Sequence, residues 1–380
     1  MKKNIAIVIT RLDLGGAQQI ALYLAKNINR KRYNVYLISG AGGYLDNKAK
    51  KIKELNLIFM KSLKHPVSLL NDIRALFELK KIFKEKKIDI VHTHSSKAGV
   101  LGRIAAKMAG VKFIVHTIHG FPFHKFQNPV SFFIYLVLEK IAAKFCDKLV
   151  AVGKDVVDYG LKNKVGKKEQ YVVIRAGIDI NLFKNAKVNK KEYLLNYGLS
   201  DKKITVGMIG NLKKQKNPLE FVNIAKEVIK VDENVQFIFA GDGPLKQKVN
   251  YLIKKFELEK NVKFIGWIEE PEKFIKAIDI FILTSLWEGL PCTLIQSIVA
   301  GKICIATNIN GNREILGKIN PWLLYEPGNY IQAAKKILII KNEKDHKKHF
   351  NIKKVKDLIN EFDFKFMLSE YEKLYSYVNF

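Results

Sequence analysis

Cysteine and long apolar runs are both scarce in this chain. Only three of its 380 residues are cysteine and none of them form a Cys-x-x-Cys pair, which argues against a disulfide framework. At the amino terminus, Ile5–Ile9 supplies five apolar residues before Thr10, too few for the core of a signal peptide. The most apolar stretch, residues 132–138, is far shorter than the ~18 residues that span a bilayer. We therefore expect a cytoplasmic protein whose membrane contact would be peripheral.

Acidic residues are also few compared with basic ones. The chain has 66 Lys and Arg against 36 Asp and Glu, a formal net charge of +30. Residues 1–180 hold 33 basic and 13 acidic residues, a net of +20. A basic amino-terminal half suits an anionic partner such as a membrane surface, a phosphorylated ligand or nucleic acid. Lysines on solvent-exposed helix faces, without any anionic partner, would explain this charge equally well. The sequence contains no nucleic-acid recognition motif, so we expect no nucleic-acid partner.

Short apolar runs of β-forming residues alternate with helical patterns throughout the chain. Alternation of this kind predicts parallel, doubly wound sheets. The pattern restarts after a Lys-rich connection at about 184–200, and a single core rarely serves more than ~250–300 residues, so we expect two α/β domains. The predicted strands are 5–9, 35–39, 88–92, 113–117, 148–152, 204–209, 236–240, 262–265, 280–284 and 303–307. The main predicted helices are 17–29, 69–86, 98–109, 131–146 and an aromatic-rich segment at about 360–378.

Ligands of open α/β sheets bind beyond the carboxyl ends of the strands, where this chain has polar or glycine-rich segments. The first segment carries Gly15 and Gly16 between a strand and a helix. It is neither Gly-x-Gly-x-x-Gly nor a P-loop, but its backbone and the following helix end suit a phosphate. A tight turn without a ligand explains these glycines equally well.

Three further strand ends carry candidate functional residues. His119 follows the strand at 113–117 and can point toward a ligand. Lys216 lies in a loop with Gly210 and two more lysines, where an anion would bind. Glu288 lies in a Gly- and Pro-bounded loop before a helix that carries Gln296. Structural or solvent-exposed roles remain open for each.

Two pairs of histidines raise the question of a metal site. His92 and His94 share one face of a predicted strand, and His116 lies near His119. No carboxylate or cysteine ligands cluster near them in the sequence. We therefore expect no metal site.

The loop and helix around Glu288 carry a family resemblance. Ser285-x2-Glu288-Gly289-Leu290-Pro291, followed by Gln296, Ala300-Gly301-Lys302 and Gly311-x2-Glu314, closely resembles the donor-site signature of family 4 glycosyltransferases. Other segments match the family in the same order along the chain. They are Gly15-Gly16, residues 94–99, His119-Gly120-Phe121, Gly177-Ile178-Asp179 with Phe183, Gly241-Asp242-Gly243-Pro244-Leu245 and Phe264-x-Gly266-Trp267.

The resemblance implies a fold and a reaction. The fold is α/β, with two facing Rossmann-like doubly wound domains (GT-B type) and a C-terminal helix that returns to the first domain. The implied bounds are 1–185 for an acceptor-side domain, 186–358 for a nucleotide-sugar-binding domain and 359–380 for the returning helix. The reaction is metal-independent transfer of a sugar, with retention of configuration, in surface polysaccharide synthesis. The nucleotide-sugar, most often a UDP-sugar, is a substrate, so no cofactor is expected.

The resemblance also implies partners and residue roles. The acceptor would be a glycan or a polyprenyl-linked glycan, and the enzyme would work on the inner face of the cell membrane, with its anionic surface as a further partner. His119, Glu288 and Lys216 are the implied catalytic residues. The implied donor- and phosphate-binding residues are Gly15, Gly16, Asn211, Lys213, Gly241, Gly266, Trp267, Gly289, Leu290, Pro291 and Gln296.

Two positions depart from the family pattern and keep other functions open. Gln296 stands where the family has a second Glu, and it retains only one acceptor oxygen. Asn211 stands where the family has an Arg that assists the diphosphate. A catalytically silent donor-binding protein is therefore one alternative. A nucleotide-sugar 2-epimerase, which shares the architecture, is another, although the Glu288 motif argues against it.

Overall fold

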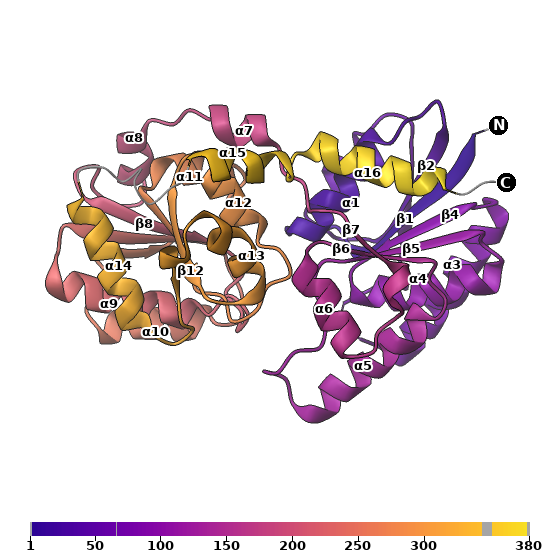
Figure 1. Cartoon of the computed structure of the whole chain (residues 1–380), viewed down its shortest axis with the longest axis horizontal. Coiled ribbons are helices and arrows are strands. Elements are labelled where there is room, and N and C mark those ends of the chain that lie inside the picture. Colours follow the sequence, from indigo (N-terminus) through magenta and orange to yellow (C-terminus); the bar gives the residue numbers. More distant parts are fainter. Residues whose placement is uncertain (1, 66, 344–351, 378–380) are drawn as a thin grey trace. The chain divides into compact units, whose positions relative to one another are not determined.

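The computed structural model describes residues 2–65, 67–343 and 352–377 (Figure 1). The chain divides into two compact units, one formed by Met1–Gly177 with Phe364–Phe380 and the other by Ile178–Asp363. The boundary predicted near residue 185 falls at the end of α7 (Ile180–Asn185), within the second unit. Of the predicted returning segment 359–380, residues 378–380 lie outside the described part of the chain.

A parallel sheet of seven strands, ordered β3-β2-β1-β4-β5-β6-β7, forms the centre of the first unit. All five residues of β4 are buried, which is typical of a strand covered by helices on both faces. The strand order reverses between β1 and β4, and this switch point is where such sheets bind ligands. The strands are β1 (Lys3–Arg11), β2 (Tyr33–Gly40), β3 (Leu55–Met60), β4 (Ile90–His94), β5 (Phe113–Ile118), β6 (Lys148–Ala151) and β7 (Tyr171–Val173).

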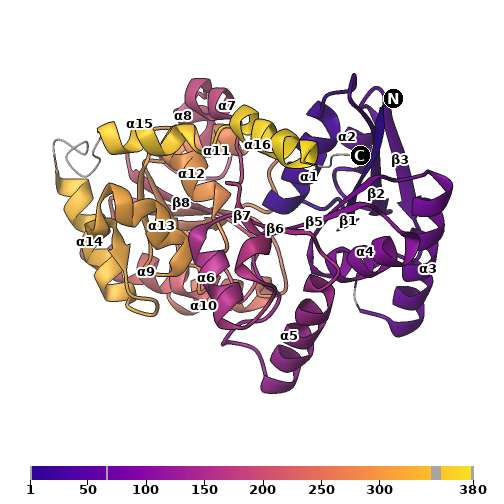
Figure 2. The same cartoon turned by 45° about the vertical axis from the view of Figure 1, so that its right-hand side comes forward.

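Helices cover both faces of this sheet, with α3, α4 and α5 on one face and α1 and α16 on the other (Figures 1 and 2). The helix α16 reaches the unit from the C-terminal end of the chain: Tyr23 of α1 stacks on Phe364 with ring centroids 4.0 Å apart. The predicted return of the C-terminal helix is thus confirmed. The helices are α1 (Gly16–Asn27), α2 (Asp46–Lys50), α3 (Leu69–Glu85), α4 (Ser96–Ala109), α5 (Pro129–Ala143), α6 (Lys154–Lys162), the 3₁₀-helix η1 (Lys168–Gln170) and α16 (Phe364–Ser376).

The second unit has the same plan, with six parallel strands ordered β10-β9-β8-β11-β12-β13. All six residues of β9 and all five of β12 are buried, so the sheet forms the core of this unit as well. Here the order reverses between β8 and β11. The strands are β8 (Ile204–Ile209), β9 (Val235–Ala240), β10 (Val262–Phe264), β11 (Ile280–Leu283), β12 (Ile303–Thr307) and β13 (Leu324–Tyr325).

The helices of the second unit again form two layers, with α9, α10 and α14 on one face of the sheet and α11, α12 and α15 on the other (Figure 1). They are α7, α8 (Lys190–Leu195), α9 (Pro218–Val231), α10 (Lys246–Lys255), α11 (Pro271–Ala277), α12 (Cys292–Val299), α13 (Asn310–Ile319), the 3₁₀-helix η2 (Pro321–Leu323), α14 (Tyr330–Asn342) and α15 (Ile352–Asn360).

The two doubly wound sheets confirm the predicted fold class, and three local features differ from the prediction. The edge strands β3, β7 and β13 were not predicted, and two of them have only two or three residues. The Lys-rich connection at 184–200 contains a helix that was not predicted, α8, and its Lys190 forms an ion pair of 2.6 Å with Asp279. In the segment predicted at about 360–378, Asn360 is the last residue of α15, and a separate helix, α16, covers Phe364–Ser376.

Candidate active site

The glycine loop of the first unit joins β1 to α1 at the switch point. Gly15 precedes α1 in an extended conformation, and no side chain caps this helix end. The first N–H groups of an uncapped helix are free to donate to an anion. The end of β1, which leads into this loop, is tied to the residue after β4, since the Oγ1 atom of Thr10 and the Oγ atom of Ser95 lie 2.7 Å apart. The position of Gly15 and Gly16 therefore suits the predicted phosphate contact.

A buried histidine cluster lies at the carboxyl ends of β4 and β5. The Nδ1 atom of His92 lies 2.6 Å from the hydroxyl of Tyr375, and its Nε2 atom lies 2.7 Å from Oγ1 of Thr117. Thr117 in turn bonds the hydroxyl of Tyr371 at 2.8 Å. Burial lowers the pKa of His92 to about 3, so this ring is neutral at physiological pH. The cluster thus connects the returning helix α16 to β5, the strand that precedes His119.

His94 and His119 form a direct pair in this cluster. Nδ1 of His94 lies 2.9 Å from Nε2 of His119. Burial lowers the pKa of His119 to about 4 and that of His94 well below its usual range, so both rings are neutral. Nε2 of His94 is buried without a partner. A proton on this atom would leave a buried N–H without an acceptor, so we infer that His94 donates from Nδ1 to His119.

That arrangement determines what His119 can offer a ligand. When Nε2 of His119 accepts from His94, its proton lies on Nδ1, and this nitrogen makes no hydrogen bond within the described part of the chain. His119 is only half-buried. It can therefore donate a hydrogen bond from Nδ1 to a sugar hydroxyl or a phosphate oxygen.

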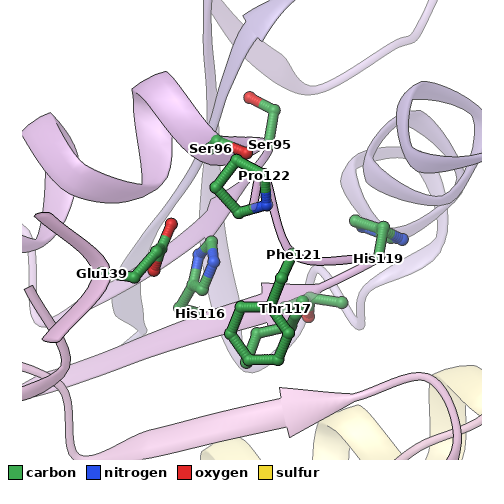
Figure 3. Close-up of a pocket in the computed structure, with 10 residues that line it drawn as sticks. Ser95, Ser96, His116, Thr117, His119, Phe121, Pro122 and Glu139 are labelled. Atoms are coloured by element: carbon green, nitrogen blue, oxygen red, sulfur yellow. The ribbon is translucent and has the colours of Figure 1, made fainter. Parts of the chain in front are cut away.

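A small pocket of about 30 Å³ opens beside His119 (Figure 3). Its wall includes Ser95 and Ser96 from the start of α4, together with His116 and Glu139. Glu139 was not among the predicted site residues, although it is the one acidic residue of α5, a mostly apolar helix. Its carboxylate accepts from the Arg103 guanidinium at 2.7 Å, and both side chains are almost fully buried.

In the second unit, Lys216 and Glu288 meet at the switch point. Lys216 follows β8 and Glu288 follows β11, and Lys216 Nζ lies 2.5 Å from Glu288 Oε1. Both side chains are largely buried, 15% and 7% exposed. Ser285 donates to the same carboxylate oxygen at 2.6 Å, and the Gln215 amide reaches the other at 3.4 Å. The structure thus brings two predicted catalytic residues into one ion pair.

The two loops that carry this ion pair are joined by their backbones. Leu286 N donates to Gln215 O at 2.8 Å, and Thr284 Oγ1 donates to Lys216 O at 2.7 Å. Gln215 and Thr284 were not predicted, because hydrogen bonds between loops leave no periodic pattern in a sequence. These bonds hold the two loops of the ion pair together.

Glycines allow the neighbouring loops to approach closely. Gly241 has a φ of 149°, and a Cβ there would lie 1.8 Å from Gly210 O. Its N–H donates to Gly266 O at 2.7 Å. A Cβ on Gly311, in the first turn of α13, would lie 2.6 Å from Gly289 O. Backbone therefore packs directly on backbone around the ion pair, and a side chain at Gly241 or Gly311 would not fit there.

The remaining predicted donor residues lie around these loops. Leu290 and Pro291 are buried at the start of α12, which no side chain caps, and Gln296 of α12 is 7% exposed. The Gln296 amide makes no hydrogen bond within the described residues. Three other predicted positions make no hydrogen bond to the ion pair. Asn211 is half-buried, and Lys213 and the 45%-exposed Trp267 lie at the surface.

The histidine pairs raised the question of a metal ion. Within the ranges that the structure describes, no group of three or more His, Cys, Asp or Glu side chains is arranged to hold one. Both ring nitrogens of His92 are occupied by hydrogen bonds.

Comparison with known proteins places both units in recognised families. Residues 14–182 match the model of glycosyltransferase family 4, and residues 189–357 match that of glycosyl transferases group 1. A UDP-Gal:alpha-D-GlcNAc-diphosphoundecaprenol alpha-1,3-galactosyltransferase of Escherichia coli is 35% identical over 310 residues, 79% of this chain and 78% of that protein.

Two further proteins match over nearly the whole chain. A Campylobacter jejuni alpha-1,4-N-acetyl-D-galactosaminyltransferase, named for an undecaprenol-linked acceptor, is 24% identical over 98% of both chains. The crystal structure of Anabaena HepE in complex with UDP and glucose superposes with a TM-score of 0.83 at 19% identity, covering 99% of this chain and 100% of that one. This likeness confirms the predicted GT-B class of fold.

Proposed function

Since this chain belongs to the group 1 and family 4 glycosyltransferases, we propose that it transfers a hexosyl group from a UDP-sugar to a polyprenyl-diphosphate-linked glycan. The transfer retains the anomeric configuration and needs no metal ion. The observation that carries the proposal is the ion pair of Lys216 and Glu288 at the switch point of the second sheet. A buried ion pair that is fixed by neighbouring loops and surrounded by glycines suits a charged, bulky ligand such as a nucleotide diphosphate.

The second unit would stabilise the leaving group. When the bond from the anomeric carbon to the diphosphate breaks, negative charge builds up on the phosphate oxygens. Lys216 would supply positive charge there, and the uncapped start of α12 would supply N–H donors. Glu288 would hold Lys216 in place and orient hydroxyls of the sugar. Gln296 would bind the ribose with one carbonyl acceptor in place of a carboxylate.

The first unit would contribute His119 and the glycine loop. A neutral His119 that donates from Nδ1 can hold a sugar hydroxyl or a phosphate oxygen, but its low pKa makes it a poor proton donor at neutral pH. The backbone of Gly15 and Gly16 would offer N–H groups to phosphate. The acceptor hydroxyl would attack from the face that the nucleotide leaves, which is the geometry of retention.

The names of relatives support the choice of substrates. The Escherichia coli and Campylobacter jejuni proteins are named for galactosyl and N-acetylgalactosaminyl transfer to undecaprenol-linked acceptors. We therefore propose UDP-galactose or UDP-N-acetylgalactosamine as the donor. We also propose that the enzyme works at the cytoplasmic face of the membrane, on a lipid-linked acceptor, in surface polysaccharide synthesis.

Activity in the presence of a chelator tests the metal-independent part of this proposal. We expect the purified chain to release UDP at an unchanged rate, within about twofold, when EDTA is in large excess, because Lys216 and helix N–H groups supply the charge that a metal would otherwise supply. UDP release and sugar incorporation would be measured together. Complete loss that added Mg²⁺ or Mn²⁺ reverses would contradict metal independence, and conversion of the donor to an epimer would indicate an epimerase.

A further inference from the structure

The helix α9 holds a buried carboxylate that forms no ion pair within the described part of the chain. Glu220 is 5% exposed and lies in the first turn of the helix. Its carboxylate accepts hydrogen bonds from the side-chain amide of Asn217 at 2.5 Å and from the N–H of Gly328 at 3.2 Å. Burial raises the pKa of the Glu220 carboxyl, because a charge held away from water is costly. A charge buried at such a cost is a candidate for a functional role.

Asn217, which donates to this carboxylate, has an unusual backbone. It precedes α9 in the left-handed conformation, with φ 48° and ψ 56°. Residues other than glycine rarely adopt this conformation, and the residue before a proline, here Pro218, prefers an extended backbone. An Asn in this position often accepts an N–H of the helix that follows, but the Asn217 side chain makes no such cap. Its amide donates to Glu220 instead, so the carboxylate holds a strained residue in place.

The conformation of Asn217 determines how the backbone of Lys216 lies directly before it. The carbonyls of Lys216 and Asn217 both accept from Oγ1 of Thr284, at 2.7 and 3.0 Å. The N–H groups of the same two residues both donate to the carbonyl of Lys213, at 3.0 and 3.2 Å. From this turn the Lys216 side chain extends to Glu288. A different conformation of Asn217 would turn both carbonyls away from Thr284 and displace the lysine.

The second donor to Glu220 comes from a turn more than a hundred residues along the chain. Gly328 has a φ of 87°, which favours glycine, and it lies between β13 and α14. The helix α14 packs beside α9 on the same face of the sheet (Figure 1). Glu220 therefore ties the loop that carries Lys216 to the helical layer of the second unit.

We propose that Glu220 and Asn217 are positioning residues for Lys216. Glu220 bonds neither Lys216 nor Glu288, and it acts through the amide of Asn217, which keeps the loop in the conformation that presents the lysine to the diphosphate. This inference rests on the proposed function, which gives Lys216 its role at the leaving group. A carboxylate in the first turn also stabilises the positive end of its helix. That role alone would make the loss of Glu220 independent of Lys216.

A double-mutant cycle with Lys216 separates positioning from stability. Glu220→Leu keeps a similar volume and removes the acceptor of the Asn217 amide, and we expect it to lower turnover about tenfold. In the Lys216→Ala background the same change should alter turnover less than about twofold, because only a lysine that is present can be displaced. The matched control is Glu227→Leu, at a half-buried position of the same helix, which should leave turnover unchanged in both backgrounds. Equal losses from Glu220→Leu in the two backgrounds would overturn the proposal.

Conservative replacements test the route through Asn217. Glu220→Gln keeps one carbonyl acceptor for the Asn217 amide and should stay within about threefold of the parent. Asn217→Gly keeps the left-handed conformation and should also stay within about threefold, whereas Asn217→Ala should lose about tenfold, because alanine adopts that conformation poorly. If Glu220→Leu does not fold, the two Asn217 variants still decide. Equal turnover of these two variants would show that the conformation of Asn217 does not position the lysine.

The affinity for UDP distinguishes this proposal from the proposed function, since its measurement needs no turnover. By titration calorimetry, we expect Asn217→Ala to weaken UDP binding at least about threefold, and to leave it unchanged in the Lys216→Ala background. If UDP binding shows this coupling but the parent transfers no sugar, the reaction proposed above fails and the positioning stands. If the parent transfers sugar and Asn217→Ala weakens UDP binding equally with and without Lys216, the positioning fails alone. A parent that binds no UDP would contradict both.

Discussion

Replacing Lys216 with Ala is expected to lower turnover by about 10²–10³-fold, the effect typical of removing one preorganised group that stabilises charge in a transition state. The lysine side chain lies over Gly210, and its Nζ atom reaches Glu288 at 2.5 Å. No other cation bonds Glu288 in the described part of the chain, so the variant would face the leaving UDP without this charge. Turnover would be measured at saturating donor and acceptor.

The same replacement leaves the Glu288 carboxylate without its cation, so stability must be measured alongside turnover. Breaking a buried ion pair costs about 3–5 kcal/mol. We therefore compare melting temperatures and assay at a temperature where the variant stays folded. Lys230→Ala, at an exposed position near the end of α9, is the matched control and should stay within about twofold of the parent. Near-normal turnover of folded Lys216→Ala would remove the lysine from the mechanism.

Replacing His119 with Ala is expected to lower turnover by about 10- to 100-fold while the fold persists. The loss follows from the Nδ1 donor that His119 offers to the ligand. His94→Leu should lower turnover less, because it keeps the His119 ring and removes only the partner that fixes its proton on Nδ1. Equal losses in the two variants would show that the pair acts through packing alone.

The pH dependence of turnover distinguishes a hydrogen-bond donor from an acid–base catalyst. Burial lowers the pKa of His119 to about 4, so the ring is neutral at every pH above that value. No step assigned to His119 is therefore expected between pH 6 and 8, and turnover of the parent and of His119→Ala should change in parallel there. A step near pH 6.5 that the Ala variant lacks would show that His119 titrates during catalysis.

Much of the fold could be predicted from the sequence because buried parallel strands and their helices leave regular patterns. The strands β8 and β12 occur where the apolar runs predict them. The short edge strands β7 and β13 could not be found in the same way, since two or three residues carry no periodicity. Strand order also has no local signal, and it is the order that makes β8 and β11 neighbours.

The candidate site was likewise predictable only in part, since single residues could be predicted but their contacts could not. His119, Lys216 and Glu288 were predicted as individual residues, but the ion pair joins positions 72 residues apart and depends on the strand order. The polarity of α5 would be misread from its pattern, which predicts a buried apolar face and an exposed Glu139. The reversal depends on Arg103 of α4, a residue that only the packing of the two helices brings to Glu139.

The linkage formed in a defined transfer reaction tests the central claim most directly. The purified chain would be given UDP-galactose or UDP-N-acetylgalactosamine, a diphospholipid-linked sugar acceptor and excess EDTA, and the product would be examined by NMR. We predict one sugar added for each UDP released, with the α configuration of the donor kept in the new bond. A β linkage, or consumption of donor with no sugar on the acceptor, would contradict the account.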